Sequence, residues 1–225
     1  MLQPDPQEQR HLDRLAELGV STELFKKATE WATSQAGQNS DYDAPAMKGI
    51  TFWSRTNRYL AERLTDPEET TPPWQWTSRD SILRVIHPSL THAITAISGE
   101  GGVGDLKKPA RSKNPKGRVM ARLVEENSFY IEAHGQSVLA TRDEVEFGRE
   151  LDAVPLWFFL YKRTKTGLKA ELSLPVKMNG MYVNEWQERI PVPLLGVDPG
   201  FDVALRDTPD SAPSPNVLLE QRAEE

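Results

Sequence analysis

Apolar positions recur with helical spacing through the first 66 residues, which predicts three helices. Leu12, Leu15 and Leu18 form the first apolar stripe, which ends at Gly19. Asp5 precedes a proline and stands three residues before a glutamate, an arrangement typical of a helix N-terminus. The second helix is predicted from a cap at Ser21 to about residue 36, and the third covers about residues 51–64.

From about residue 81 the pattern changes to strands. Residues 81–87 and 90–98 are β-branched and apolar, which predicts a hairpin that turns at Pro88-Ser89. Residues 155–162 are apolar on both alternating sets, as is typical of a central strand covered on both faces. Further strands are predicted at about 168–174 and 186–192, with a short helix at 117–127. Residues 128–151 give no clear pattern.

These elements predict an α+β protein whose N-terminal helices pack on an antiparallel or mixed sheet. We expect a helical segment at residues 1–66 and a sheet-containing core at 67–195, together forming one compact unit. Residues 98–122 are expected to project as a loop. Residues 196–225 are rich in Pro, Asp, Ser and Glu, carry a net charge of −5 and are predicted to be a disordered acidic tail.

Composition excludes several kinds of site. The chain contains no cysteine, so it has no disulfide, thiolate zinc site, iron–sulfur cluster or thiol nucleophile. The four histidines are scattered without an i,i+4 partner, and we predict neither a metal site nor a cofactor. The longest apolar run, residues 154–161, is too short to span a membrane, and no signal peptide follows Met1. The expectation is a cytoplasmic protein without membrane contact.

Positive charge is concentrated in one segment. Residues 107–122, called the basic segment below, carry a charge of +7, whereas the other residues, 20 basic and 33 acidic, sum to −13. Clustered Lys and Arg neutralise the phosphates of nucleic acids, and a solvated loop that balances an acidic protein is the alternative interpretation. No aromatic residue interleaves the run, so base stacking is not indicated there. The seven residues are Lys107, Lys108, Arg111, Lys113, Lys116, Arg118 and Arg122.

A glycine-rich stretch immediately precedes this segment. Gly99, Gly101, Gly102 and Gly104 match the spacing G-x-G-x-x-G, but no helix opens at the last glycine, as a dinucleotide site requires. Asp105 and Leu106 stand where a P-loop needs lysine and a hydroxyl. Two interpretations remain, a phosphate-binding nest of backbone N–H groups and a flexible loop without a ligand.

Two carboxylates are catalytic candidates. Asp152 and Glu171, with Lys169, supply the residue types of a metal-dependent nuclease, but the lysine precedes the glutamate, which reverses the usual E-x-K order. Glu171 is more simply explained as a strand residue on the exposed face. Trp74 and Trp76 are either a stacking platform or strand-edge packing.

Three motifs resemble a family of uncharacterised bacterial proteins associated with plasmids, prophages and other mobile elements. They are Lys113-Asn114-Pro115-Lys116-Gly117, leading through a helix to Asn127, then Glu171-Leu172-Ser173-Leu174-Pro175, and Trp186-Gln187-Glu188-Arg189-Ile190. The resemblance covers about residues 80–195. It implies no ligand, activity or site.

The sequence therefore favours a non-enzymatic bacterial binding or regulatory protein that contacts DNA, RNA or another polyanion through the basic segment. One alternative is a metal-dependent enzyme acting on a phosphorylated or nucleic-acid substrate, with Asp152 and Glu171 as its carboxylates. The other is an interaction subunit of a mobile-element or phage-related system that recognises only a protein partner.

Overall fold

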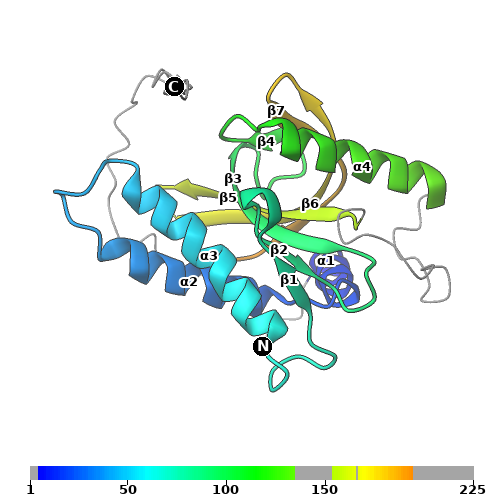
Figure 1. Cartoon of the computed structure of the whole chain (residues 1–225), viewed down its shortest axis with the longest axis horizontal. Coiled ribbons are helices and arrows are strands. Elements are labelled where there is room, and N and C mark those ends of the chain that lie inside the picture. The colour runs from blue at the N-terminus through cyan, green and yellow to red at the C-terminus, as the bar shows by residue number, and fades with distance from the viewer. Residues whose placement is uncertain (1–4, 135–153, 166, 195–225) are drawn as a thin grey trace, which may run out of the picture.

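The computed structural model describes residues 5–134, 154–165 and 167–194 of the chain (Figure 1). Its described part contains four α-helices, one short 3-10 helix and seven strands. The helices are α1 (Pro6–Glu17), α2 (Thr22–Gly37), α3 (Met47–Thr65), η1 (Arg79–Ser81) and α4 (Arg118–His134). The strands are β1 (Gln75–Thr77), β2 (Arg84–Ile86), β3 (Ala93–Gly101), β4 (Ala110–Ser112), β5 (Leu156–Thr164), β6 (Gly167–Asn179) and β7 (Tyr182–Val192).

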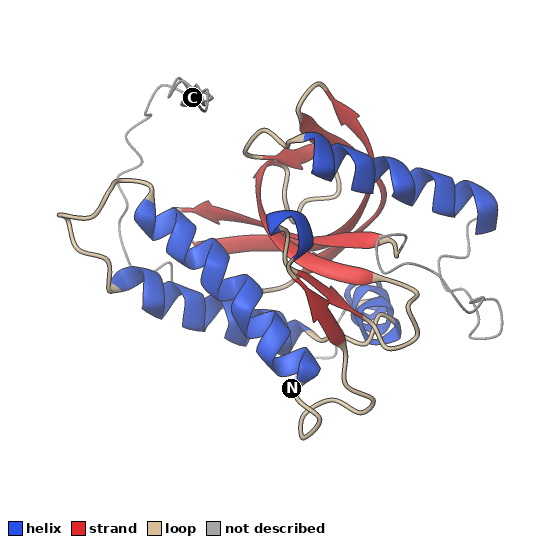
Figure 2. Cartoon of the chain, in the orientation of Figure 1, coloured by secondary structure: helices blue, strands red, loops and turns tan. Residues whose placement is uncertain are grey.

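The strands, red in Figure 2, form one mixed sheet. Their order is β1-β2-β3-β5-β6-β7, and β4 pairs with β3 beside this path. β3 and β5 are parallel, because the chain crosses through β4 and α4 between them, and the other neighbours are antiparallel. The predicted α+β class with helices preceding a mixed sheet is therefore confirmed. The predicted hairpin is β2 and β3, although its connection spans residues 87–92 and is longer than a two-residue turn.

Helices cover both faces of the sheet, with α1, α2 and α3 on one side and α4 on the other (Figure 1). β5 shows why two layers are needed. Trp157, Phe159 and Tyr161 pack into the core under the N-terminal helices. Leu156, Phe158 and Leu160 pack into the core under α4. This confirms the prediction of a central strand covered on both faces.

The helix starts agree with the sequence at two of the N-termini. The Asp5 carboxylate accepts a hydrogen bond from the Gln7 N–H, and the Ser21 hydroxyl accepts one from the Leu24 N–H. Other boundaries differ. α3 begins at Met47, α4 continues to His134, and β6 and β7 are longer than predicted. Residues 135–153 and the expected acidic tail lie outside the described residues.

A buried asparagine from each helix layer completes the hydrogen bonding of the sheet. Asn57 of α3 lies against β3 beyond the short β2, where its Oδ1 accepts from the Ala96 N–H at 2.8 Å and its Nδ2 donates to the Ala96 carbonyl at 3.0 Å. Asn127 of α4 bonds in the same way to both backbone groups of Leu156. Backbone groups that would be buried without a partner are satisfied by these side-chain amides.

No helix in the described ranges has the length and apolar character needed to cross a membrane.

Candidate functional site

The glycine-rich stretch is an ordered part of the sheet and the loop that follows it. β3 extends to Gly101 and pairs with β4, and residues 102–109 connect the two strands. A Cβ on Gly102 would lie 2.3 Å from the Cβ of Lys108, and Gly104 has a φ of +73°. The glycines thus allow the loop to fold back on itself. The loop expected to project packs instead against β6 and β7.

A buried ion pair anchors this loop. Arg189 of β7 donates from Nε to Oε1 of Glu171 at 2.9 Å and from Nη2 to Oε2 at 2.7 Å. The same guanidinium donates to the carbonyls of Gly102 and Lys108, each at 2.9 Å. The Ser173 hydroxyl and the Gly104 N–H complete the shell of the carboxylate, at 2.9 and 2.7 Å. The paired charges therefore hold the loop on the sheet.

Glu171 does not lie on an exposed face, which corrects the expectation from strand alternation. Its side chain is completely buried, because the loop and Arg189 cover the face of β6 that alternation had assigned to solvent. Both carboxylate oxygens are already hydrogen-bonded, and Asp152 lies outside the described residues. Within the described ranges, no cluster of three His, Asp or Glu side chains is arranged to hold a metal ion.

The loop N–H groups that could form a phosphate nest have internal acceptors. The Gly102 N–H donates to the Pro109 carbonyl, and the Asp105 N–H to the Gly102 carbonyl. The Gly104 N–H donates to the Glu171 carboxylate, an anion supplied by the protein itself. A phosphate would have to displace these partners to bind here.

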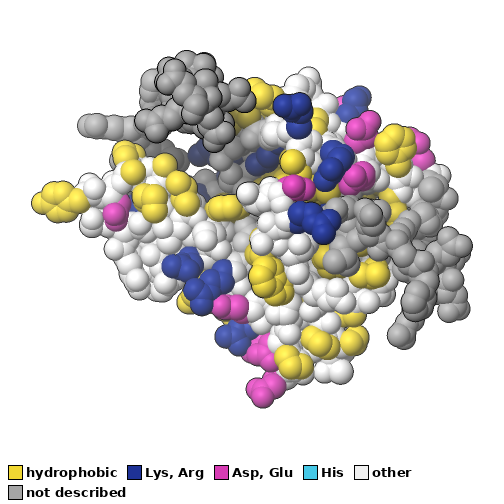
Figure 3. Space-filling view, in the orientation of Figure 1, with side chains coloured by type: hydrophobic (Ala, Val, Ile, Leu, Met, Phe, Trp, Pro, Cys, Tyr) yellow, Lys and Arg dark blue, Asp and Glu magenta, His cyan; other side chains and the backbone are white. Residues whose placement is uncertain are grey.

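The basic segment divides into paired and unpaired cations. Lys108 pairs with Asp105, Arg111 with Glu100, and Arg122 with both Asp80 and Glu126. The other four form no ion pair within the described part of the chain; they are Lys107, Lys113, Lys116 and Arg118. Figure 3 shows dark blue Lys and Arg side chains, with carboxylates among them, over the region where β4 and the start of α4 lie.

Two of the unpaired cations, Lys116 and Arg118, lie at the beginning of α4. Arg118 is the first residue of the helix, and its first turn contains no acidic side chain. Lys116 is partly buried, and this desolvation lowers its pKa. The positive end of a helix dipole disfavours cations, and an anion placed there would be stabilised.

Arg122 connects this region to η1. Its Nη2 lies 3.4 Å from the Asp80 carboxylate, and both side chains are about half exposed. Arg118 stands one turn earlier on the same face of α4, because residues four apart in a helix are neighbours. η1 also forms one wall of a groove, so the basic segment and the groove adjoin.

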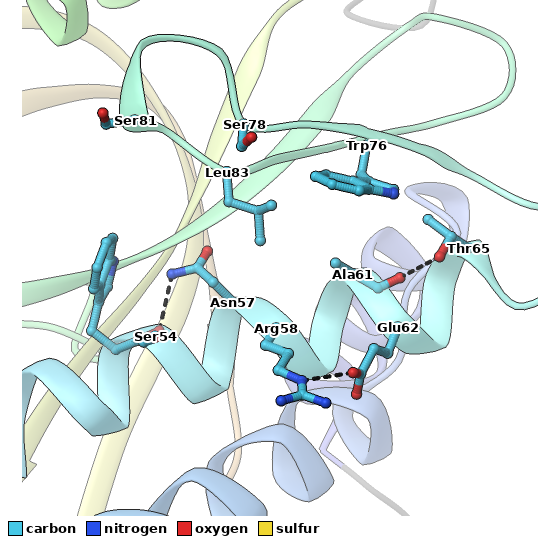
Figure 4. Close-up of a pocket in the computed structure, with 11 residues that line it drawn as sticks. Ser54, Asn57, Arg58, Ala61, Glu62, Thr65, Trp76, Ser78, Ser81 and Leu83 are labelled. Atoms are coloured by element: carbon cyan, nitrogen blue, oxygen red, sulfur yellow. Dashed lines mark hydrogen bonds and ion pairs between the residues drawn. The ribbon is translucent and has the colours of Figure 1, made fainter.

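The groove runs along α3 beneath β1, η1 and the entry to β2, with a volume of about 470 Å³ (Figure 4). Trp53 of α3 and Trp76 of β1 contribute exposed indoles, 40% and 57% accessible as residues. The Trp53 Nε1 donates to the Ala96 carbonyl at 2.9 Å, which fixes its ring. The lining residues are Trp53, Ser54, Asn57, Arg58, Ala61, Glu62, Thr65, Trp76, Ser78, Ser81 and Leu83.

Sequence reasoning missed this groove. It considered Trp76 only beside Trp74 and did not predict a site at Trp53. Trp74 is buried and packs edge-on against the stacked rings of His87 and His92, so the two neighbouring tryptophans do not form one platform. Trp53 and Trp76 lie on different elements and no local pattern links them. The sequence shows two tryptophans in separate segments and gives no sign that the fold brings them to one groove.

Comparisons of the chain with protein-family models, with curated proteins and with solved structures found no match.

Proposed function

We propose that the protein binds nucleic acid, and that the basic segment contacts the phosphate backbone. The observation that carries the proposal is the set of four cations, Lys107, Lys113, Lys116 and Arg118, that lack a carboxylate partner within the described chain although the protein has a net charge of −6. An acidic protein offers many internal partners for a lysine. Four cations left unpaired in one segment favour an external anion.

The ordered backbone supports the proposal further. β4, the Glu171–Arg189 pair and the start of α4 order the backbone that carries these side chains. A preorganised set of cations loses less conformational entropy on binding than a disordered arm does. Phosphates bound near the first turn of α4 also interact favourably with the helix dipole.

The test is a salt series of binding measurements by fluorescence anisotropy, with a labelled nucleic acid. Four contacts predict that log K falls against log salt with a slope of roughly −3 to −4. The variant Lys107→Ala/Lys113→Ala/Arg118→Ala should weaken binding and make the slope shallower by about 3. Lys116 is left unchanged because its side chain is partly buried.

The matched control is Lys26→Ala/Lys27→Ala/Lys48→Ala, which changes the net charge equally on the helices of the opposite layer. The proposal expects this control to bind almost as the native chain does. If the two triple variants lose affinity equally, or if the native chain shows no affinity at low salt, the basic segment is not the binding surface.

A further inference from the structure

The tryptophan groove has the features of a site for flat aromatic groups. Trp53 and Trp76 are both substantially exposed, whereas most large apolar side chains among the described residues are buried. Figure 4 shows Trp76 and Leu83 facing α3, with Ala61 of the helix below Trp76. The volume of about 470 Å³ lies within the roughly 300–1,000 Å³ range of ligand sites.

Unused polar groups border these apolar surfaces. Ser54, Ser78 and Ser81 line the groove, and none of their hydroxyls makes a hydrogen bond within the described part of the chain. A hydroxyl can both donate and accept, so it can match the edge of any nucleobase. Asp80 and Ser81, at this wall, have φ values of 58° and 61°, in the left-handed region that residues other than glycine seldom adopt.

The groove also adjoins the basic segment. Ser78 and Ser81 flank Asp80, which pairs with Arg122, and Arg118 lies one helical turn from Arg122. The groove and the start of α4 are therefore linked through the Arg122–Asp80 pair. Because bases in a duplex are stacked and paired, only unpaired bases can turn into the groove.

We infer that the groove binds unpaired bases of a single-stranded nucleic acid, by stacking on Trp76 and Trp53. This inference rests on the proposed function and extends it to a substrate class. Stacking on indoles is tolerant of sequence, since every base has a π-face, so the site prefers single strands to duplexes without reading a particular sequence.

The experiment compares one mixed-sequence oligonucleotide, single-stranded and annealed to its complement, by fluorescence anisotropy at low salt. The native chain should bind the single strand at least several-fold more tightly. Trp76→Ala should weaken single-strand binding roughly 5- to 100-fold and leave duplex binding and the salt slope unchanged. Trp76→Phe keeps a ring and should retain most of the affinity.

Two further variants protect the test from a folding artefact. Ser54→Glu places a carboxylate on an exposed helical position at the groove, where glutamate is a good helix former, and should also lower single-strand affinity selectively. Tyr42→Ala removes a fully exposed aromatic ring that does not line the groove and should change nothing.

The outcomes separate the two proposals. Equal affinity for single strand and duplex, or an equal loss for both on Trp76→Ala and Ser54→Glu, overturns the groove inference and leaves the phosphate contacts intact. Absence of any salt-dependent binding by the native chain overturns the proposed function, and the groove inference with it.

Discussion

The loop anchor at Glu171 and Arg189 and the tryptophan groove differ in how much of their chemistry is already used. The anchor has residues of the kind found in active sites, a carboxylate, a guanidinium and a glycine-rich loop. Each of them is bonded to another part of the protein. The groove has two tryptophans whose rings are exposed. It also has three serines whose hydroxyls make no hydrogen bond within the described chain.

The difference shows that residue type alone is a poor guide to function. A buried charge must be paired, so the protein supplies the partners itself and the group is then structural. An exposed indole has no such requirement and stays available to a ligand. Substitutions at the anchor should therefore reduce stability, whereas substitutions at the groove should leave it nearly unchanged.

Removing the anchor's cation is the strongest test of this comparison. Arg189→Met should lower the free energy of unfolding by about 3–5 kcal/mol, because it leaves Glu171 buried without a counter-charge. Urea unfolding monitored by circular dichroism measures the loss. The double variant Glu171→Gln/Arg189→Met should recover part of it, since no charge then remains buried.

Arg14→Met is the matched control for that substitution. Arg14 makes the same two-fold contact with Glu188, at 2.8 and 2.9 Å, but both side chains are partly exposed to water. Its loss should cost about 1 kcal/mol or slightly more. If both substitutions lowered the free energy of unfolding equally, burial would not make the Glu171–Arg189 pair more important for stability than the Arg14–Glu188 pair.

A histidine cluster, formed by the stacked rings of His87 and His92 with Trp74 edge-on against them, also has its polar groups in use, and it predicts that stability depends on pH. Burial lowers the pKa of His92 to about 3, and its Nε2 donates to the Leu18 carbonyl at 3.1 Å. Below pH 6.5 the unfolded chain binds a proton there that the native protein does not. Stability should therefore fall as the pH decreases from 6.5 toward 3, by up to about 1.4 kcal/mol per pH unit.

Unfolding titrations between pH 7 and pH 4.5 measure this dependence. His92→Gln should flatten the pH profile, because the titrating group is removed, whereas His11→Gln, away from the cluster, should keep the slope of the native chain. An unchanged slope in His92→Gln would show that other groups cause the acid sensitivity.

Smaller effects are expected from the glycines. Gly104→Ala should cost about 1–2 kcal/mol, because φ is +73° and the new Cβ would lie 3.2 Å from the Ala170 carbonyl oxygen. Gly49→Ala, in α3 with open space around it, should instead stabilise by about 0.5–1 kcal/mol. Equal effects in thermal unfolding would show that the anchored loop does not require its glycines.

The sequence predicted what depends on local periodicity. The leucine stripe of α1, the caps at Asp5 and Ser21 and the two-sided β5 all follow from spacing within a few residues. It did not predict contacts between distant segments. The partner of Glu171 is 18 residues away, and Asn57 bonds to Ala96 across 39 residues. Period-2 alternation places Glu171 opposite the core but says nothing of the loop that covers it.

The same limit applies to the candidate site. Concentrated charge in the basic segment is visible in the sequence, but the division into paired and unpaired cations needs the positions of Asp80, Glu100 and Asp105. Trp53 and Trp76 share a groove only because α3 lies along β1 and η1. Both features depend on tertiary structure.

The smallest expected change in stability is at the groove itself. Trp76→Ala should lower the free energy of unfolding by about 1 kcal/mol or less, because the residue is 57% exposed on an edge strand. Trp74→Ala, two residues earlier, removes a ring that is only 4% exposed and should cost several times more. Urea unfolding of the two variants compares them directly. If Trp76→Ala proved as destabilising as Trp74→Ala, Trp76 would have a structural role in the fold. That role, and not a ligand, would then explain why a tryptophan stands at this position.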